Sequence, residues 1–313
     1  MIDKTFDRLK LLGKLPNFVV VGAPKSGTTS LYHYLSQHSD IYLPVKKELH
    51  YFSSHRLIQL TQGPSDRYVV ESICKTLDAY AAYYEAVGSP NAIGDISPFY
   101  LYHEGCAERI YKELGAKTRI IILLRHPIEK AYSQYMHLVA EGRETLSFDA
   151  AIEQEAQRKS KKWLDIWLYT QSTFYAPQVE RFLSVFPREQ IFICLLEDMQ
   201  RDPKQFLQEV CEFLDILHLE SSNLSTVYNR SSAPRSKWVA RYFVAPGPLY
   251  ALANKMRRTR LRRLGGLIFA MRRRLKAWNA CQKEPLSPEM RERLEQLFRP
   301  DIDALESLLG CKL

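Results

Sequence analysis

Several features that would mark particular classes of protein are missing from this 313-residue chain. No apolar run approaches the ~18 residues that a membrane-spanning helix needs. The first sixteen residues carry Asp3 and Asp7 and only a short apolar patch, which makes them a poor signal peptide. No internal repeat or low-complexity block is visible. We therefore expect a globular, cytoplasmic protein with a single domain over residues 1–313.

Cysteine is scarce and scattered. The six cysteines stand at positions 74, 106, 194, 211, 281 and 311, and no two of them form a C-x-x-C pair. Zinc sites and redox pairs normally bring cysteines together at short spacing. We therefore expect reduced packing residues, with no disulfide framework and no metal site.

Acidic residues are absent from one long segment, 255–276, which holds ten lysines and arginines. This segment accounts for more than the whole net charge of +9, so the basicity is local. A helix here would place Leu, Ile, Phe and Met between arginine clusters, which suits contact with an anionic membrane surface or an acidic partner. A solvated helix that covers the core is the plain alternative. Because no recognition motif accompanies the charge, we expect no nucleic-acid partner.

Short apolar runs predict three buried strands, at 17–22, 118–125 and 190–198. Each run is continuous and rich in Val, Ile or Leu, as in a parallel sheet that is covered on both faces. Helical patterns lie between and after these runs, at 29–38, 72–87, 129–142 and 202–217. A C-terminal helix is expected at about 287–309, with a break at Pro300. The alternation predicts an α/β fold, a P-loop-like central parallel β-sheet flanked by helices on both faces.

The run FVVVGAPKSGTTSLYHYL, residues 18–35, has the spacing of a phosphate-binding loop but a displaced lysine. A nucleoside-triphosphate loop reads G-x-x-x-x-G-K-[ST], whereas here Thr28 follows Gly27 and the lysine is Lys25. A strand that enters such a turn and then a helix points several backbone N–H groups at one anion. The loop adds hydroxyl donors from Ser26, Thr28, Thr29 and Ser30. Lys25 at the mouth of the loop suits a donor with one group beyond a single 5′-phosphate.

This loop resembles the 5′-phosphosulfate loop of sulfotransferases that use 3′-phosphoadenosine 5′-phosphosulfate (PAPS). The run IIILLRHPIEKAYSQY resembles the 3′-phosphate motif of the same family, with Arg125 at a strand end and Ser133 eight residues later. The runs LPVKKELHYFSS, GDISPFYLYH and NRSSAPRSKW resemble elements of its bacterial and Golgi-type carbohydrate branch. The resemblance implies PAPS as the donor cosubstrate without a required metal. It also implies a carbohydrate, lipid or small-metabolite acceptor that is sulfated on a hydroxyl or, as the second choice, on an amine.

The resemblance further implies roles for single residues. Glu48 would be the general base, and Lys25 would stabilise both the transferred group and the leaving phosphate. The 3′-phosphate would be held by Arg125, Ser133, Arg235 and Lys237. His50 is a competing base, since its ordinary pKa suits proton transfer better. On an extended segment Glu48 and His50, two residues apart, would face the same side.

The acceptor end of the site is less well defined by the sequence. Relatives that act on heparan-type chains carry a lysine where this chain has Ile96, so a heparan-like acceptor is disfavoured and Lys25 remains the main cation at the transfer point. Asp95 is expected to contact the acceptor or to support the site. Trp163, four residues before Trp167 on an expected helix, is an acceptor contact or a packing residue.

Two other functions fit the same sequence. A P-loop kinase would use ATP and Mg²⁺, but the lysine that should follow Gly27 is missing. A non-enzymatic peripheral membrane protein on a retired nucleotide-binding fold would use residues 255–276.

Overall fold

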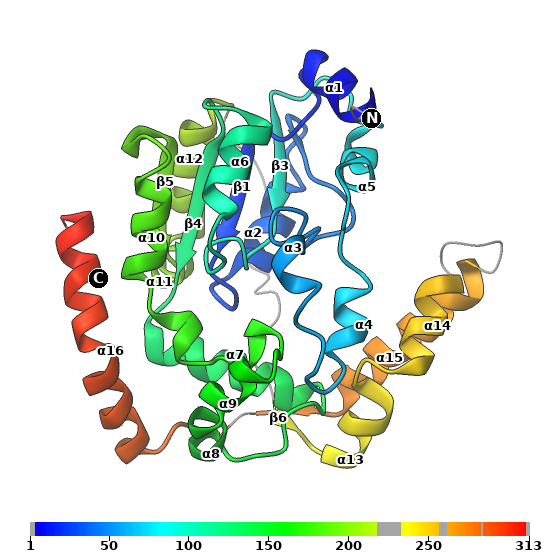
Figure 1. The fold of residues 1–313 in the computed structure, drawn as a ribbon, viewed down its shortest axis with the longest axis vertical. Helices are drawn as coiled ribbons and strands as arrows, with labels where there is room; N and C mark the ends of the chain where they lie inside the picture. The colour runs from blue at the N-terminus through cyan, green and yellow to red at the C-terminus, as the bar shows by residue number, and fades with distance from the viewer. Residues whose placement is uncertain (1–3, 218–232, 257–261, 283, 311–313) are drawn as a thin grey trace.

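The computed structural model describes residues 4–217, 233–256, 262–282 and 284–310. Its centre is a five-stranded parallel sheet with the strand order β2-β3-β1-β4-β5 (Figure 1). The strands are β1 Phe18–Gly22, β2 Ile41–Tyr42, β3 Ala92–Ile96, β4 Arg119–Leu124 and β5 Ile191–Leu195. A short antiparallel pair joins β6 Ala233–Pro234 to β7 Ala280–Cys281. The predicted α/β fold is confirmed.

The three predicted strands are present as β1, β4 and β5, but the sequence patterns missed β2 and β3. The strand β2 has only two residues, and β3 has a glycine and an acid in place of a continuous apolar run. A Cβ atom on Gly94 would lie 2.2 Å from the Phe18 ring, so close packing against β1 requires the glycine.

Helices fill the connections between the strands. Their bounds are α1 Lys4–Leu11, α2 Thr28–Leu35, α3 Ser54–Leu57, α4 Asp66–Val70, α5 Leu77–Ala81, α6 Cys106–Leu114, α7 Pro127–Ala140, α8 Phe148–Glu153, α9 Glu155–Ser160, α10 Ala176–Leu183, α11 Leu196–Arg201, α12 Pro203–Leu214, α13 Lys237–Val239, α14 Pro248–Met256, α15 Arg262–Trp278 and α16 Pro288–Leu309. The helix expected over 72–87 is shorter than predicted, because it starts only at the Thr76 cap and ends in a 3-10 turn at Ala82–Tyr84.

Alternate residues of each central strand enter different cores. In β4, Ile120 and Ile122 pack with α1, α5, α6 and α10 on one face, whereas Ile121 and Leu123 pack with α2, α11 and α12 on the other. This period of two is what a strand covered on both faces requires. A third apolar cluster lies around α7 beyond the carboxyl ends of the strands.

The C-terminal helix α16 continues through Pro300, where the sequence predicted a break. Asp301 accepts hydrogen bonds from the backbone N–H groups of Tyr175 (2.6 Å) and Ala176 (3.1 Å). Phe298 and Leu305 are buried on either side of it. Packing and this cap of α10 therefore hold the helix together where proline removes one backbone hydrogen bond.

The basic segment forms the end of α14 and most of α15, apart from 257–261, which lie outside the described residues. Figure 1 shows the two helices side by side, projecting away from the sheet. Within the described part of the chain, no helix combines the length and the apolar character needed to cross a bilayer. None of the cysteines described here forms a disulfide, and Cys311 lies outside that part.

Candidate active site

The candidate site begins where β1 turns into α2. Gly27 has a left-handed backbone (φ 88°), and a Cβ atom there would lie 2.6 Å from Leu196 and 2.7 Å from Met199. Only glycine satisfies both the conformation and the space. The predicted loop hydroxyls of Ser26, Thr28 and Ser30 are buried and that of Thr29 is half-buried. Together with the start of α2 they form the kind of cradle that binds an anion.

The two motifs found in the sequence meet in space. The Nη1 of Arg125, at the end of β4, donates to the backbone oxygen of Lys25 at 3.3 Å, across 100 residues of chain. Parallel strands explain this contact, because β1 and β4 are neighbours and end at the same edge of the sheet. The predicted donor-binding residues Lys25 and Arg125 are thus adjacent.

Two buried hydroxyls beside the loop suit an oxyanion ligand. Ser26 Oγ and Tyr175 OH have no hydrogen-bond partner among the described residues, although both residues are buried. Burial raises the pKa of Tyr175, so its hydroxyl keeps its proton and can donate. Ser26 and the backbone of Arg125 also act on the pKa of Tyr175, so the two hydroxyls lie near one another beside the loop.

The remaining predicted 3′-phosphate residues lie along α7 and beside it. Ser133 is buried on α7, two turns after Arg125. Arg235 and Lys237 are exposed and flank Ser236 just after β6, which packs beside α7. Their contact with a phosphate stays a prediction.

Glu48, the predicted base, lies in an irregular segment before α3. Its carboxylate is 3.4 Å from Lys47 Nζ and 3.6 Å from His50 Nε2. The sequence placed Glu48 and His50 on one side of an extended segment; the side chains do meet, but the backbone is not extended. Glu48 (φ 63°) and His50 (φ 53°) both adopt the left-handed region, as does Lys25 (φ 67°). Non-glycine residues rarely do so, and such strain concentrates at functional sites.

Lys47 connects the predicted base to the donor loop. Its Nζ donates to Thr28 Oγ1 (3.2 Å) and Thr29 Oγ1 (2.9 Å), in addition to its ion pair with Glu48. Burial lowers the pKa of Lys47, while Glu48 opposes that shift. The sequence showed Lys47 only as one member of a charged run, and its role as a link depends on the fold.

Burial alone would raise the pKa of Glu48, but Lys47 and His50 outweigh it and hold that pKa well below its usual range. Glu48 is therefore ionised throughout the physiological range, and it is a weaker base than a free carboxylate while these two neighbours stabilise its charge.

Asp95 reaches the site through other groups. Its carboxylate accepts from the hydroxyls of Ser97 (2.8 Å), Tyr100 (2.9 Å) and Tyr80 (3.2 Å), and it is buried. Ser97 Oγ in turn accepts from the backbone N–H of His50 (3.2 Å). Because hydroxyls enclose the carboxylate, these contacts favour a supporting position for Asp95, and its contact with an acceptor stays a prediction.

A second group of charges, which sequence reasoning missed, faces Lys25 from α7 and α15. Glu141 lies 3.6 Å from both Lys276 Nζ and His137 Nε2. The pKa of Lys25 is lowered to about 8, mainly by burial and then by the charges of Lys276 and Arg125, while Glu141 and Glu48 oppose this shift. Lys276 is therefore a second cation whose charge acts on Lys25.

Histidine and glutamate in this group differ in charge. Burial, followed by the charge of Lys25, lowers the pKa of His137 to about 3, so its ring is neutral. Burial opposes ionisation of Glu141, but the neighbouring cations lower its pKa to about 2, so it remains a carboxylate. His137 and Glu141 are four residues apart along the chain, whereas Lys276 joins them only through packing, so the sequence alone does not mark the group.

Trp163 is not brought to the donor loop. It precedes a 3-10 turn (Asp165–Trp167) and lies on no regular helix, contrary to the prediction. Its ring packs edge to face on Trp167 (4.9 Å between centroids), and the Arg158 guanidinium lies 5.3 Å from it. These are packing contacts in the cluster around α7.

Comparison with known proteins identifies a family and several relatives that this chain resembles. A family model described as the sulfotransferase family matches residues 16–219. "Membrane-associated sulfotransferase kil1" of Dictyostelium discoideum is 26% identical over 66% of this chain and 57% of its own length. Human "Carbohydrate sulfotransferase 15" is 25% identical over 64% of this chain and 44% of its own length. The chain thus spans about half the length of the curated relatives it matches.

A solved structure is similar over nearly the whole chain. The crystal structure of a sulfotransferase from Alicyclobacillus acidocaldarius is 32% identical, with a TM-score of 0.73, and the match covers 96% of this chain and 97% of that one. The similarity therefore includes the regions that carry β6, β7 and the C-terminal helices.

Proposed function

The chain belongs to the sulfotransferase family, and from this premise we propose that it transfers a sulfuryl group from PAPS to a hydroxyl of a carbohydrate, lipid or small metabolite, with an amine as the second choice. The observation that carries the proposal is the position of Lys47, which contacts both the donor loop and Glu48. Lys47 thus joins the anion-binding loop to a carboxylate base. Sulfuryl transfer to a hydroxyl needs both an anion-binding site for the donor and a base for the acceptor proton.

The roles of the residues follow from their positions. Glu48 takes the proton of the acceptor hydroxyl while the new oxygen–sulfur bond forms and the bond from sulfur to the donor phosphate breaks. Lys25 and Lys276 neutralise the phosphate oxygen that leaves with 3′-phosphoadenosine 5′-phosphate (PAP). Arg125 supplies a rigid fork for a phosphate group at the end of β4. His50 orients Glu48 through the contact at 3.6 Å.

The fit to the donor rests on buried groups that lack partners. The loop offers backbone N–H groups at the start of α2, and the Ser26 and Tyr175 hydroxyls can donate to a phosphate or sulfuryl oxygen. Across the described residues, no three His, Cys, Asp or Glu side chains lie together as metal ligands would.

Calorimetric titration with PAP, without metal, tests the donor site. We expect Arg125→Ala to weaken PAP binding about 10- to 100-fold, because a charge-assisted contact to phosphate is lost. Arg201→Ala is the matched control, since Arg201 is an exposed arginine whose only ion pair here is with Asp198. Preference for ATP with Mg²⁺ over PAP would instead favour the kinase, and binding of neither would favour a non-enzymatic protein.

Glu48→Gln separates binding from chemistry. We expect this variant to keep PAP affinity within about twofold and to lose most PAPS-dependent sulfation across a panel of glycan, lipid and phenol acceptors. A loss of only two- to threefold in turnover would contradict the base role, and His50→Gln would then be measured as its competitor.

We further propose that α15 lies on an anionic membrane surface. Leu264, Leu267, Met271 and Trp278 are between 49% and 65% exposed. At 100° per residue these four lie along one stripe of the helix, with Arg274 beside it. An exposed apolar stripe on a segment that holds many cations and no acid is complementary to anionic lipid.

A further inference from the structure

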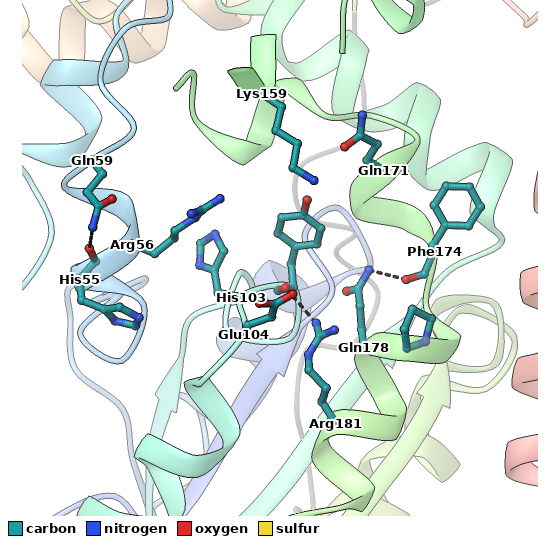
Figure 2. A pocket seen from close by; sticks show the side chains of 12 residues that line it. His55, Arg56, Gln59, His103, Glu104, Lys159, Gln171, Phe174, Gln178 and Arg181 are labelled. Atoms are coloured by element: carbon teal, nitrogen blue, oxygen red, sulfur yellow. Dashed lines mark hydrogen bonds between the residues drawn. The ribbon is translucent and has the colours of Figure 1, made fainter. Parts of the chain in front are cut away.

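A cavity of about 410 Å³ lies outside the donor loop, at the same carboxyl edge of the sheet (Figure 2). Its walls come from α3, α9, α10 and the segment after β3. Small-molecule sites typically have volumes of roughly 300–1,000 Å³, so this cavity could hold a sugar-sized group.

His103 lines this cavity, and one of its ring nitrogens has no hydrogen-bond partner among the described residues. Its Nε2 lies 2.6 Å from Asp165 Oδ2, and both side chains are buried. The Nε2–H therefore donates to the carboxylate, which leaves Nδ1 for another partner. Nδ1 has no hydrogen-bond partner among the described residues, although His103 is only 4% exposed. A buried polar atom of this kind normally contacts a ligand, an ion or water.

The cavity is positively charged. Figure 2 shows Arg56 and Lys159 extending toward one another from opposite walls. Neither has an ion-pair partner within the described ranges. Arg181 donates to the backbone oxygens of Leu101 (3.2 Å) and Tyr102 (2.9 Å) and not to a carboxylate. The lining contains one acid, Glu104, against these three cations.

The cavity is close to the predicted base. The Phe99 ring lies 6.2 Å from the His50 ring and 6.0 Å from the His103 ring, between centroids. One aromatic side chain therefore separates the Glu48–His50 pair from the cavity. A substrate that reacts at Glu48 could reach past Phe99 into it.

We propose that this cavity is a subsite for an oxyanion on the acceptor, a carboxylate, sulfate or phosphate group some distance from the hydroxyl that reacts. Arg56 and Lys159 bind the oxyanion, and His103, held by its contact with Asp165, forms part of the wall. Charge-assisted contacts from two directions select an acidic acceptor over a neutral one of the same shape. This inference rests on the proposed function and names the kind of substrate that the site would take.

Three matched sugars test the subsite: p-nitrophenyl β-glucoside, the corresponding glucuronide and the corresponding glucoside 6-phosphate. Each is titrated by calorimetry into the full chain saturated with PAP. We expect at least one charged sugar to bind about tenfold or more tightly than the neutral glucoside. The double variant Arg56→Gln/Lys159→Gln should remove this preference without changing PAP affinity. Arg201→Gln serves as the control for loss of an exposed arginine.

The inference is overturned if the charged sugars bind no more tightly than the neutral one, which includes the case in which none of them binds. It is also overturned if the preference survives in the double variant. A preference for glucuronide over phosphate, or the reverse, identifies the oxyanion. PAP affinity is measured first in the same experiment, so failure of the donor site and failure of the subsite are seen separately; if PAP does not bind, the sugars are titrated without it.

Discussion

The charge of Lys25, in the donor loop, depends on pH just above neutrality. Its pKa is lowered to about 8, chiefly by burial. Below pH 8 the ammonium is present and attracts the donor phosphate; as the pH rises through 8 it is lost. We expect PAP affinity to fall by up to about tenfold per pH unit above pH 8, the limit for loss of one proton. Titrations at pH 7, 8 and 9 measure this.

The control for that experiment is Lys25→Gln. This variant should bind PAP weakly with an affinity that no longer changes over the same range. A wild-type affinity that stays level between pH 7 and 9 would show that Lys25 does not meet the donor.

Asp66 is predicted to be the most costly single residue to truncate outside the site. It is fully buried and accepts hydrogen bonds from the backbone of Gly63 (2.9 Å) and Leu164 (2.8 Å), from Trp167 Nε1 (2.9 Å) and from Arg143. Asp66→Ala would leave the buried Arg143 charge with only its longer ion pair to Glu141 (3.7 Å), and would leave the other donors to Asp66 unsatisfied. We expect the free energy of unfolding to fall by about 3–5 kcal/mol, measured by urea denaturation.

Asp303→Ala provides the comparison, because Asp303 is exposed and should change stability by no more than about 0.5 kcal/mol. An equal, small effect for both variants would mean that the Asp66 network does not hold the loop before α4 against the Trp163–Trp167 turn.

Some site residues could be predicted from the sequence and others could not. The difference is whether the residues that give them their role are close in sequence. Lys25 and Arg125 could be found because each follows a buried strand and has a characteristic near neighbour in sequence. Lys47 and Lys276 could not, since their importance lies in contacts with residues 18 or more positions away. Asp95 shows the opposite limit: the sequence revealed an acid beside the site but not the hydroxyls that enclose it.

At the scale of elements, α15 has two faces with different surroundings. Lys276 lies on roughly the opposite side of the helix from the stripe that contains Leu267 and Met271. It pairs with Glu141 and faces Lys25. One helix thus pairs with Glu141 on one side and carries the exposed stripe on the other.

We expect Lys276→Gln to produce two effects of opposite sense. PAP affinity at pH 7 should fall about tenfold, because a cation near the phosphate is lost. The pH at which affinity starts to decline should rise above 8, because Lys276 lowers the pKa of Lys25. Titration across pH 7–10 measures both. Lys255→Gln, the same change on α14 at an exposed position, should alter neither; if it matches Lys276→Gln, only overall charge is involved.

Elements with a continuous apolar pattern were predictable and interrupted ones were not. Apart from Arg119 at the start of β4, the strands β1, β4 and β5 carry no charged residue, whereas β3 carries Gly94 and Asp95 for reasons of tertiary packing. The continuity of α16 through Pro300 depends likewise on Asp301, whose partners are 125 and 126 residues away. Local propensity alone could not supply either result.

At the scale of the whole molecule, the membrane proposal predicts binding to anionic vesicles. We expect the chain to sediment with vesicles that contain phosphatidylserine and to remain free with phosphatidylcholine alone, with binding that weakens as salt rises. Met271→Glu should reduce sedimentation about tenfold or more by placing a charge in the apolar stripe. The cytoplasmic location expected from the sequence stays a prediction.

Leu297→Glu on α16 is the matched control, since Leu297 is also exposed (40%) but lies outside α15. Equal sedimentation with neutral vesicles, or an equal loss in both variants, would contradict a specific role for the stripe.

The contacts of Lys47 also bear on the order in which donor and acceptor bind. In the structure its ammonium is shared between Glu48 and the hydroxyls of Thr28 and Thr29. An arriving sulfuryl group would compete for the same ammonium, and each degree of withdrawal would leave Glu48 a stronger base. Glu48 would then reach its full basicity only after the donor has bound. Initial-rate kinetics should accordingly show a compulsory order in which the donor binds first. Without donor, the protein should not deprotonate an acceptor.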